Sequence, residues 1–157
     1  MSQDSAPKQP TSRRVMSWLL RSPFHIFMGG MLLITVTGRK SGRAITTPVN
    51  YVRAGDTLLI ASKADRTWWR NVRGGAPVTL VLNGRAYRAQ ANTIEQLPER
   101  EQELLHFFRL TRHTIAGIHL TADGQPTKPE KFQRVVQDRI VIKITNLVSE
   151  ASYATAS

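Results

Sequence analysis

An Asn-Gly pair between two stretches of alternating apolar residues restricts the possible folds of this chain more than any other segment. The first stretch covers residues 78–82, Asn83-Gly84 follows, and the second stretch covers residues 85–94. Asn and Gly both accept positive φ, and the turn they form has a twist that matches the twist of paired strands. The segment is therefore predicted to be an antiparallel β-hairpin.

Further runs rich in apolar and β-branched residues predict four more strands. They cover residues 31–37, 45–52, 57–61 and 139–145. A glycine-containing turn at residues 54–56 joins the second of these strands to the third. In the last run, Ile140, Ile142 and Ile144 recur at every second position, which is the period of a strand with one buried face.

Three helices are expected among these strands. A short one covers residues 68–72 and stops at Gly74-Gly75. A second begins at Pro98, because proline suits the first helical turn and acidic residues are favourable near its positive end. A third covers residues 130–137. The apolar side chains expected to be buried by the second and third helices are Leu104, Leu105, Phe107, Phe108, Phe132, Val135 and Val136.

This order of elements predicts a single, mainly β (α+β) domain over residues 13–147. Consecutive hairpins, followed by a strand that comes after two helices, indicate an antiparallel barrel closed by its last strand. Residues 1–12 are interpreted as a disordered polar arm, and residues 148–157 as a frayed tail. Residues 13–20 are predicted to form an amphipathic helix, for which closing one end of the barrel is favoured over the alternative of a peripheral membrane contact.

The positive charge of the chain lies in its first half. The net charge is +11, and residues 39–88 hold ten Lys and Arg against two carboxylates. Residues 89–138 hold six Lys and Arg against seven carboxylates. Such a field implies an anionic partner, which can be a nucleic acid, an anionic lipid or a phosphorylated small molecule, unless it only keeps the protein soluble.

The densest group of cations is the turn between the first two strands. Arg39, Lys40 and Arg43 lie there with Ser41, between Gly38 and Gly42. The two glycines allow positive φ, so successive N–H groups can form a concave anion site, and arginine can hold phosphate or carboxylate with two parallel hydrogen bonds. The turn differs from the phosphate-binding loop of nucleotide triphosphatases, because a strand and not a helix follows it.

Two further features surround this turn in the sequence. Pro48 cannot donate to a strand ladder, so it marks an edge strand or a bulge. Trp68 and Trp69 point about 100° apart on a short helix. One of the two is expected to fill the core, and the other could form a wall for a flat ligand, although a pair used only for packing is the commoner case.

Metal and hydrolytic chemistry have no support in the sequence. The chain lacks cysteine, which excludes disulfides and thiolate catalysis. The four histidines, His25, His106, His113 and His119, lack the spacing of metal ligands, so no metal site is predicted. No secretory signal is evident, and the location expected is the cytoplasm, with membrane association as the consequence if the helix at residues 13–20 binds lipid.

Four short motifs, in their order and spacing, resemble those of the deazaflavin-dependent nitroreductase family. They are Gly38-Arg39-Lys40-Ser41-Gly42, Thr47-Pro48, Ala61-Ser62-Lys63 and Trp69-x-Asn71. Members of that family are small split β-barrels, usually homodimers, that bind the deazaflavin coenzyme F-420. The resemblance covers residues 18–95 and fits the helix and the last strand more loosely. It implies a split β-barrel oxidoreductase of the flavin and deazaflavin type.

The resemblance also implies roles for individual residues. The phosphate and carboxylate tail of the cofactor would be held by Arg39, Lys40, Ser41 and Arg43, with Gly42 in the same turn. Thr47, Pro48 and Val49 would lie along the deazaflavin ring, Ser62 and Lys63 would support it, and Trp68, Trp69 and Asn71 would close the pocket. No residue is assigned as a proton donor.

The leading hypothesis is therefore an enzyme that passes a hydride from reduced F-420 to a quinone, a nitro compound or an activated alkene. One alternative is a split-barrel oxidoreductase that binds flavin mononucleotide (FMN). The other is a non-enzymatic basic barrel that binds nucleic acid. The small-molecule hypothesis is preferred and no nucleic acid is expected, because the cations converge on one turn instead of lining a long strip with interleaved aromatic residues.

Overall fold

The computed structural model describes residues 30–111 and 116–150. The polar arm predicted at residues 1–12, the helix predicted at residues 13–20 and the end of the predicted tail, residues 151–157, lie outside the described residues.

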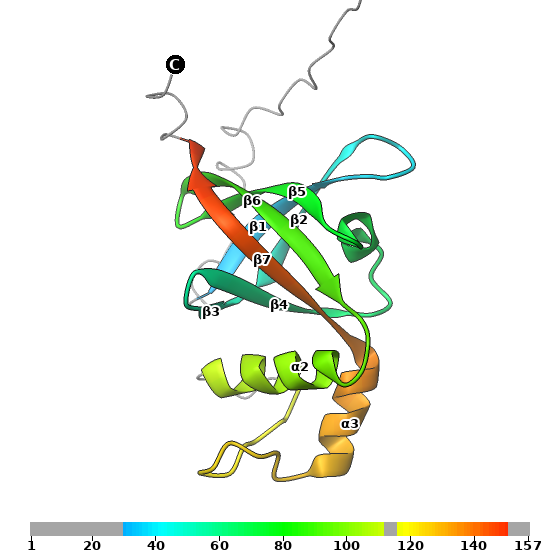
Figure 1. The fold of residues 1–157 in the computed structure, drawn as a ribbon, viewed down its shortest axis with the longest axis vertical. Coiled ribbons are helices and arrows are strands. Elements are labelled where there is room, and N and C mark those ends of the chain that lie inside the picture. The colour runs from blue at the N-terminus through cyan, green and yellow to red at the C-terminus, as the bar shows by residue number, and fades with distance from the viewer. Residues whose placement is uncertain (1–29, 112–115, 151–157) are drawn as a thin grey trace, which may run out of the picture.

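Seven antiparallel strands form one sheet in the order β2-β1-β5-β6-β7-β4-β3 (Figure 1). Their bounds are β1 Met31–Thr37, β2 Ala44–Asn50, β3 Val52–Ala54, β4 Thr57–Lys63, β5 Ala76–Leu82, β6 Arg85–Ile94 and β7 Arg139–Ser149. The mainly β, antiparallel character predicted from the sequence is confirmed. The predicted hairpin is present as β5 and β6, with Asn83 at φ 49° and Gly84 at φ 75° in its turn.

The strand predicted over residues 45–52 is divided at Tyr51, which the sequence did not indicate. The Tyr51 N–H donates to the Gly30 carbonyl at 2.7 Å, which extends the β1–β2 ladder by one step, and β3 begins at the next residue, Val52. Before Tyr51, β2 pairs with β1, and after it, β3 pairs with β4 at the other end of the strand order. A single residue thus connects the two edge strands, so the sheet has to curl until its edges approach each other, and β2 lies beside β4.

The last strand connects the two halves of the sheet, as predicted. Ile142 of β7 pairs with Thr93 of β6 on one side and with Ile60 of β4 on the other. β7 also continues beyond the predicted end: Val148 pairs with Arg88, where a frayed tail was expected from residue 148. The continuation follows a shift of register between Arg88 and Gln90 of β6.

Alternation along the strands divides the core into two clusters. In β7, Ile140, Ile142 and Ile144 face the interior of the curled sheet, whereas Val141 faces the opposite side. Two helices, α2 (Glu99–Leu110) and α3 (Pro129–Asp138), cover that opposite side (Figure 1). Of the seven helix residues predicted to be buried, Leu105 and Val135 are only half-buried, and the others are buried as expected.

Candidate functional site

A single helical turn, η2 (Trp68–Val72), carries the aromatic pair and lies where the short helix was predicted. It connects β4 to β5 and packs against β1, β5 and β6. Trp68, Trp69 and Val72 enter the interior cluster. Gly74 and Gly75 follow with φ values of 77° and 94°, which a residue with a side chain adopts only under strain, so the helical turn stops there.

The basic turn, residues 38–43, joins β1 to β2 and projects beside η2 (Figure 1). The side chains of Arg39, Lys40 and Arg43 are all exposed. Of the two glycines, only Gly42 has the expected positive φ, 67°. Gly38 is required for space, because a Cβ at this position would lie 2.5 Å from Ser41 Oγ.

The backbone of the basic turn is largely committed to bonds within the protein. Gly38 N donates to Arg43 O and Gly42 N donates to Gly38 O, both at 2.8 Å. Arg43 N donates to Ser41 Oγ at 3.2 Å, and Arg39 N donates to a side chain of η2. The sequence predicted that free backbone N–H groups of this turn form a concave anion site. That prediction is wrong for four of these groups, because the N–H groups of Gly38, Arg39, Gly42 and Arg43 already have acceptors within the protein. The groups of this turn that are left to contact an anion are mostly the exposed side chains of Arg39, Lys40 and Arg43.

Asn71 joins the basic turn to η2. Its Oδ1 accepts a hydrogen bond from Arg39 N at 3.0 Å, and its Nδ2 donates to Trp68 O at 3.0 Å. One amide side chain thus uses both of its ends, and the bond to Arg39 joins residues that are 32 positions apart. The basic turn and the Trp69-x-Asn71 motif, which are separate in the sequence, are therefore in direct contact.

Both tryptophans are inside the core, although only one was expected there. Trp68 is 6% exposed and Trp69 is 4% exposed. The indole Nε1 atoms of both are buried without a hydrogen-bond partner among the described residues. The guanidinium carbons of Arg70 and Arg73 lie 5.7 and 5.2 Å from the centre of the Trp69 ring, within the range of cation–π attraction.

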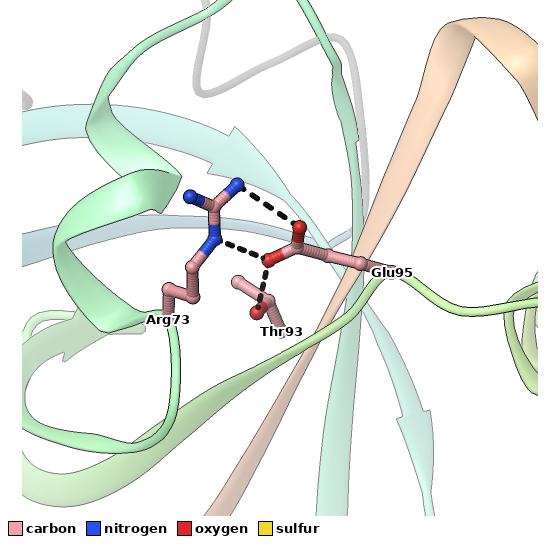
Figure 2. Close-up of polar contacts among 3 residues, drawn as sticks. All are labelled: Arg73, Thr93 and Glu95. Carbon is pink, nitrogen blue, oxygen red and sulfur yellow. Dashed lines mark hydrogen bonds and ion pairs between the residues drawn. The ribbon is translucent and has the colours of Figure 1, made fainter.

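Arg73 is also held by Glu95, which was not among the site residues predicted from the sequence. Arg73 Nε donates to Glu95 Oε1 at 2.7 Å and Nη2 donates to Oε2 at 3.0 Å, while Thr93 Oγ1 donates to the same Oε1 at 2.9 Å (Figure 2). The paired geometry of an Arg fork on a carboxylate fixes both side chains. In the sequence, Glu95 is the first of several carboxylates, up to Glu103, whose pattern is typical of a solvated helix entry, so nothing there distinguishes it.

The hydrogen bonds from Arg73 are the main reason why the pKa of Glu95 lies below its ordinary value of 4.5. Burial opposes this shift, whereas Thr93 and the charges of Arg73 and Arg100 add to it. A carboxyl with a lowered pKa in the folded state stabilises that state above its unfolded pKa, and the stabilisation is lost as the pH falls through the folded pKa.

We therefore expect Glu95→Gln to lower the melting temperature near neutral pH and to have progressively less effect below about pH 4.5, the ordinary pKa of the group. Thermal unfolding of the wild type and the variant over a series of pH values measures the difference. A difference that stays constant down to strongly acidic pH would contradict the assignment of this pair.

The residues of β2 that were expected to line a flat ring lie on two different faces. Val49 is buried in the interior cluster and Thr47 is half-buried on the same face, whereas Pro48 between them is exposed on the other face. Pro48 pairs with Leu33 in an unbroken register, so it marks an edge strand and not a bulge. Thr47 and Val49 can share one surface with the core, and Pro48 cannot be part of it.

Ser62 and Lys63 end β4, shortly before η2. Ser62 is the one buried polar side chain among the described residues, and its Oγ donates to Lys63 O at 3.4 Å. Lys63 is exposed. No described hydrogen bond joins either residue to the basic turn or to η2, so their grouping with the site rests on the adjacency of β2 and β4.

Within residues 30–111 and 116–150, no group of three or more His, Asp and Glu side chains is placed to hold a metal ion. His25 and His113 lie outside these residues. None of the helices in the described part is long and apolar enough to cross a membrane.

The arrangement suits a ligand that has an anionic end and a flat, polar body. Three exposed cations lie on one turn, and that turn is fixed to a helical turn whose indole N–H groups are buried with no acceptor in the described part of the chain. A buried donor without a partner is costly, so a ligand carbonyl that reached one of these groups would gain an unusually favourable hydrogen bond. These donors and cations fit a deazaflavin that carries a phosphorylated tail.

Comparison with known proteins supports this fit. The sequence matches the family described as F-420H(2)-dependent quinone reductase over residues 22–119. None of the curated proteins compared with the chain matches it.

Solved structures with a similar chain trace include three of related size. An F-420-H(2)-dependent reductase (FDR-A) is 20% identical, with 75% of this chain and 95% of that chain covered and a TM-score of 0.45. A conserved hypothetical protein from Mycobacterium tuberculosis is 13% identical, with 95% and 86% covered and a TM-score of 0.48. The FAD and heme binding protein from Mycobacterium smegmatis is 15% identical, with 76% and 65% covered and a TM-score of 0.47.

Proposed function

The chain belongs to the F-420H(2)-dependent quinone reductase family, and we propose that it transfers a hydride from reduced F-420 to a quinone, a nitro compound or an activated alkene. Asn71 supplies the observation that carries the proposal, because it fixes the basic turn against the helical turn that bears the tryptophans. That contact brings the three exposed cations of one segment next to the tryptophan-bearing helical turn of another.

In this proposal Arg39, Lys40 and Arg43 hold the phosphate and the tail carboxylates of the cofactor. Their side chains take this role because the backbone donors of the turn are mostly used within the protein. Ser41 Oγ accepts from Arg43 N and keeps its own proton available for an acceptor on the ligand. Bound F-420 supplies the hydride chemistry, and the protein binds, orients and shields it.

The body of the cofactor is proposed to lie near η2 and the interior face of β2. Trp68 and Trp69 border this region from the core, where their rings are buried and two arginines contact the Trp69 ring. Thr47 and Val49 contribute from the same face of β2, and Ser62 and Lys63 from the end of the neighbouring strand. No side chain of this site is given the role of proton donor.

We further propose that the protein is a homodimeric split β-barrel. β2 is an edge strand whose residues are mostly exposed, including Ile45 at 37%. Such an edge presents unpaired backbone groups to which a second copy can bind.

The test of the proposed function is binding of F-420 in competition with FMN. The protein is incubated with each compound, exchanged into ligand-free buffer, and its absorbance spectrum recorded. We expect F-420 to be retained and to quench the tryptophan emission, because a ring would lie close to an indole. Retention of FMN alone would replace the proposal by the flavin alternative, and unchanged emission at saturating F-420 would remove both tryptophans from the site.

Replacing Asn71 by alanine should weaken F-420 binding although it removes no charge. The variant loses two hydrogen bonds worth about 0.5–1.5 kcal/mol each, and the basic turn is no longer fixed to η2. We expect the dissociation constant to rise roughly three- to tenfold, since about 1.4 kcal/mol corresponds to tenfold and part of the loss appears in stability instead.

Isothermal titration of the wild type, Asn71→Ala and Asn92→Ala measures this effect. Asn92 is the matched control, because it is an exposed asparagine of β6 that no described side-chain hydrogen bond involves. Equal affinities for the wild type and Asn71→Ala would show that the contact does not shape the site.

A further inference from the structure

We propose that Glu95, through its ion pair with Arg73, is a positioning residue for the F-420 site. The pair holds η2 in place, and with it Trp69 and the contact of Asn71 with the basic turn. The inference rests on the proposed function and adds to it two residues, Arg73 and Glu95, that the resemblance did not include.

The helical turn needs such support because it cannot stabilise itself. It comprises five residues in 3-10 geometry, and Thr67 before it makes no side-chain capping bond. Short 3-10 segments have weak internal hydrogen bonds and depend on their surroundings. Asn71 connects η2 to the basic turn, whereas Arg73, the residue that follows η2, connects it to the end of β6. The two connections fix η2 against different parts of the barrel.

The geometry of the pair restrains orientation as well as position. Two parallel hydrogen bonds fix the guanidinium plane relative to the carboxylate, and Thr93 Oγ1 holds that carboxylate from the side of β6 (Figure 2). The same guanidinium lies 5.2 Å from the centre of the Trp69 ring. Movement of Glu95 is therefore transmitted through Arg73 to an indole of the proposed site.

Glu95 also moderates the positive charge beside the basic turn. A side-chain nitrogen of Arg39 comes within 4.0 Å of the point that a Cβ on Gly74 would occupy, and Gly74 is the neighbour of Arg73 in the chain. Without the carboxylate, the Arg73 guanidinium would be released near two other cations, Arg39 and Arg70, which share this region. Repulsion would then displace the groups that are proposed to bind the cofactor.

The test compares Glu95→Gln with Glu103→Gln in a Trp18→Phe background, so that emission comes from Trp68 and Trp69 alone. Glu103 is a matched control: it is a carboxylate of similar side-chain exposure, 20% against 25%, that pairs with Lys143 at 3.4 Å away from η2. The measurements are the F-420 dissociation constant, the tryptophan emission without ligand and the melting temperature. Arg73→Gln and the double variant Arg73→Gln/Glu95→Gln are measured in the same way.

We expect Glu95→Gln to weaken F-420 binding roughly five- to twentyfold and to shift the tryptophan emission to longer wavelength, with neither change in Glu103→Gln. The double variant should bind F-420 no more weakly than whichever single variant has the lower affinity, because the two residues act as one unit.

Unchanged affinity in Glu95→Gln, even with a lower melting temperature, would reduce the pair to a structural role and overturn the inference. An equal loss in Glu103→Gln would overturn it too, since charge alone would then explain the result. These outcomes presuppose that the wild type binds F-420, and a wild type that does not bind it overturns the proposed function instead. In that case the tryptophan emission still tests part of the inference. Unchanged emission in Glu95→Gln would show that the Arg73–Glu95 pair does not position Trp69.

Discussion

Replacing Lys40 with alanine is expected to weaken F-420 binding at least about tenfold. Lys40 is exposed at the centre of the basic turn, and because the turn's backbone donors are largely engaged, the proposed function assigns the anion contacts to the side chains. A hydrogen bond to a charged group contributes about 1.5–3 kcal/mol, and about 1.4 kcal/mol corresponds to a tenfold change in affinity. Loss of one such contact therefore predicts a dissociation constant roughly 10- to 150-fold higher.

Arg134→Ala is the matched control for Lys40→Ala. It removes one positive charge from an exposed position on α3, which lies on the helix-covered side of the sheet. Each protein is titrated with F-420 and with a random oligonucleotide at two salt concentrations. A nucleic-acid binder would lose affinity for the oligonucleotide to a similar degree in both variants, because each cation on its surface contributes modestly. If Lys40→Ala bound F-420 as tightly as the wild type does, the proposed role of the basic turn in cofactor binding would be refuted.

Ile142→Ala is expected to cause the largest loss of stability. Ile142 is fully buried at the centre of β7, where it pairs with β4 and β6 and packs in the interior cluster. Truncating a buried isoleucine to alanine costs about 2–5 kcal/mol, through lost burial and the cavity that remains. Since a domain of ordinary stability has about 5–15 kcal/mol in total, the variant should unfold at a much lower denaturant concentration.

Ile45→Ala provides the comparison for this loss. Ile45 is the same residue type on the edge strand β2, but it is 37% exposed, so its truncation should change the free energy of unfolding by less than about 1 kcal/mol. Urea denaturation followed by circular dichroism measures both variants. Similar losses at the two positions would contradict the placement of β7 at the centre of the sheet.

The features that the sequence determined are those carried by neighbouring residues. Asn83 and Gly84 specify their turn because both adopt positive φ there. An apolar, β-branched run identifies β1, alternation identifies β7, and Pro98 marks the start of α2, because these signals act within one or two turns or a short strand. The order of the four motifs was likewise enough to indicate the family to which the chain belongs.

The tertiary structure alone decided how these segments meet. Tyr51 divides the segment predicted as one strand, because β2 before it pairs with β1 whereas β3 after it pairs with β4. The register of β2 turns Thr47 and Val49 inward and Pro48 outward. Arg73 and Glu95 are 22 positions apart, and Arg39 and Asn71 are 32 apart. Contacts over such separations depend on strand register and on the curl of the whole sheet, and no local preference of either residue contains that information.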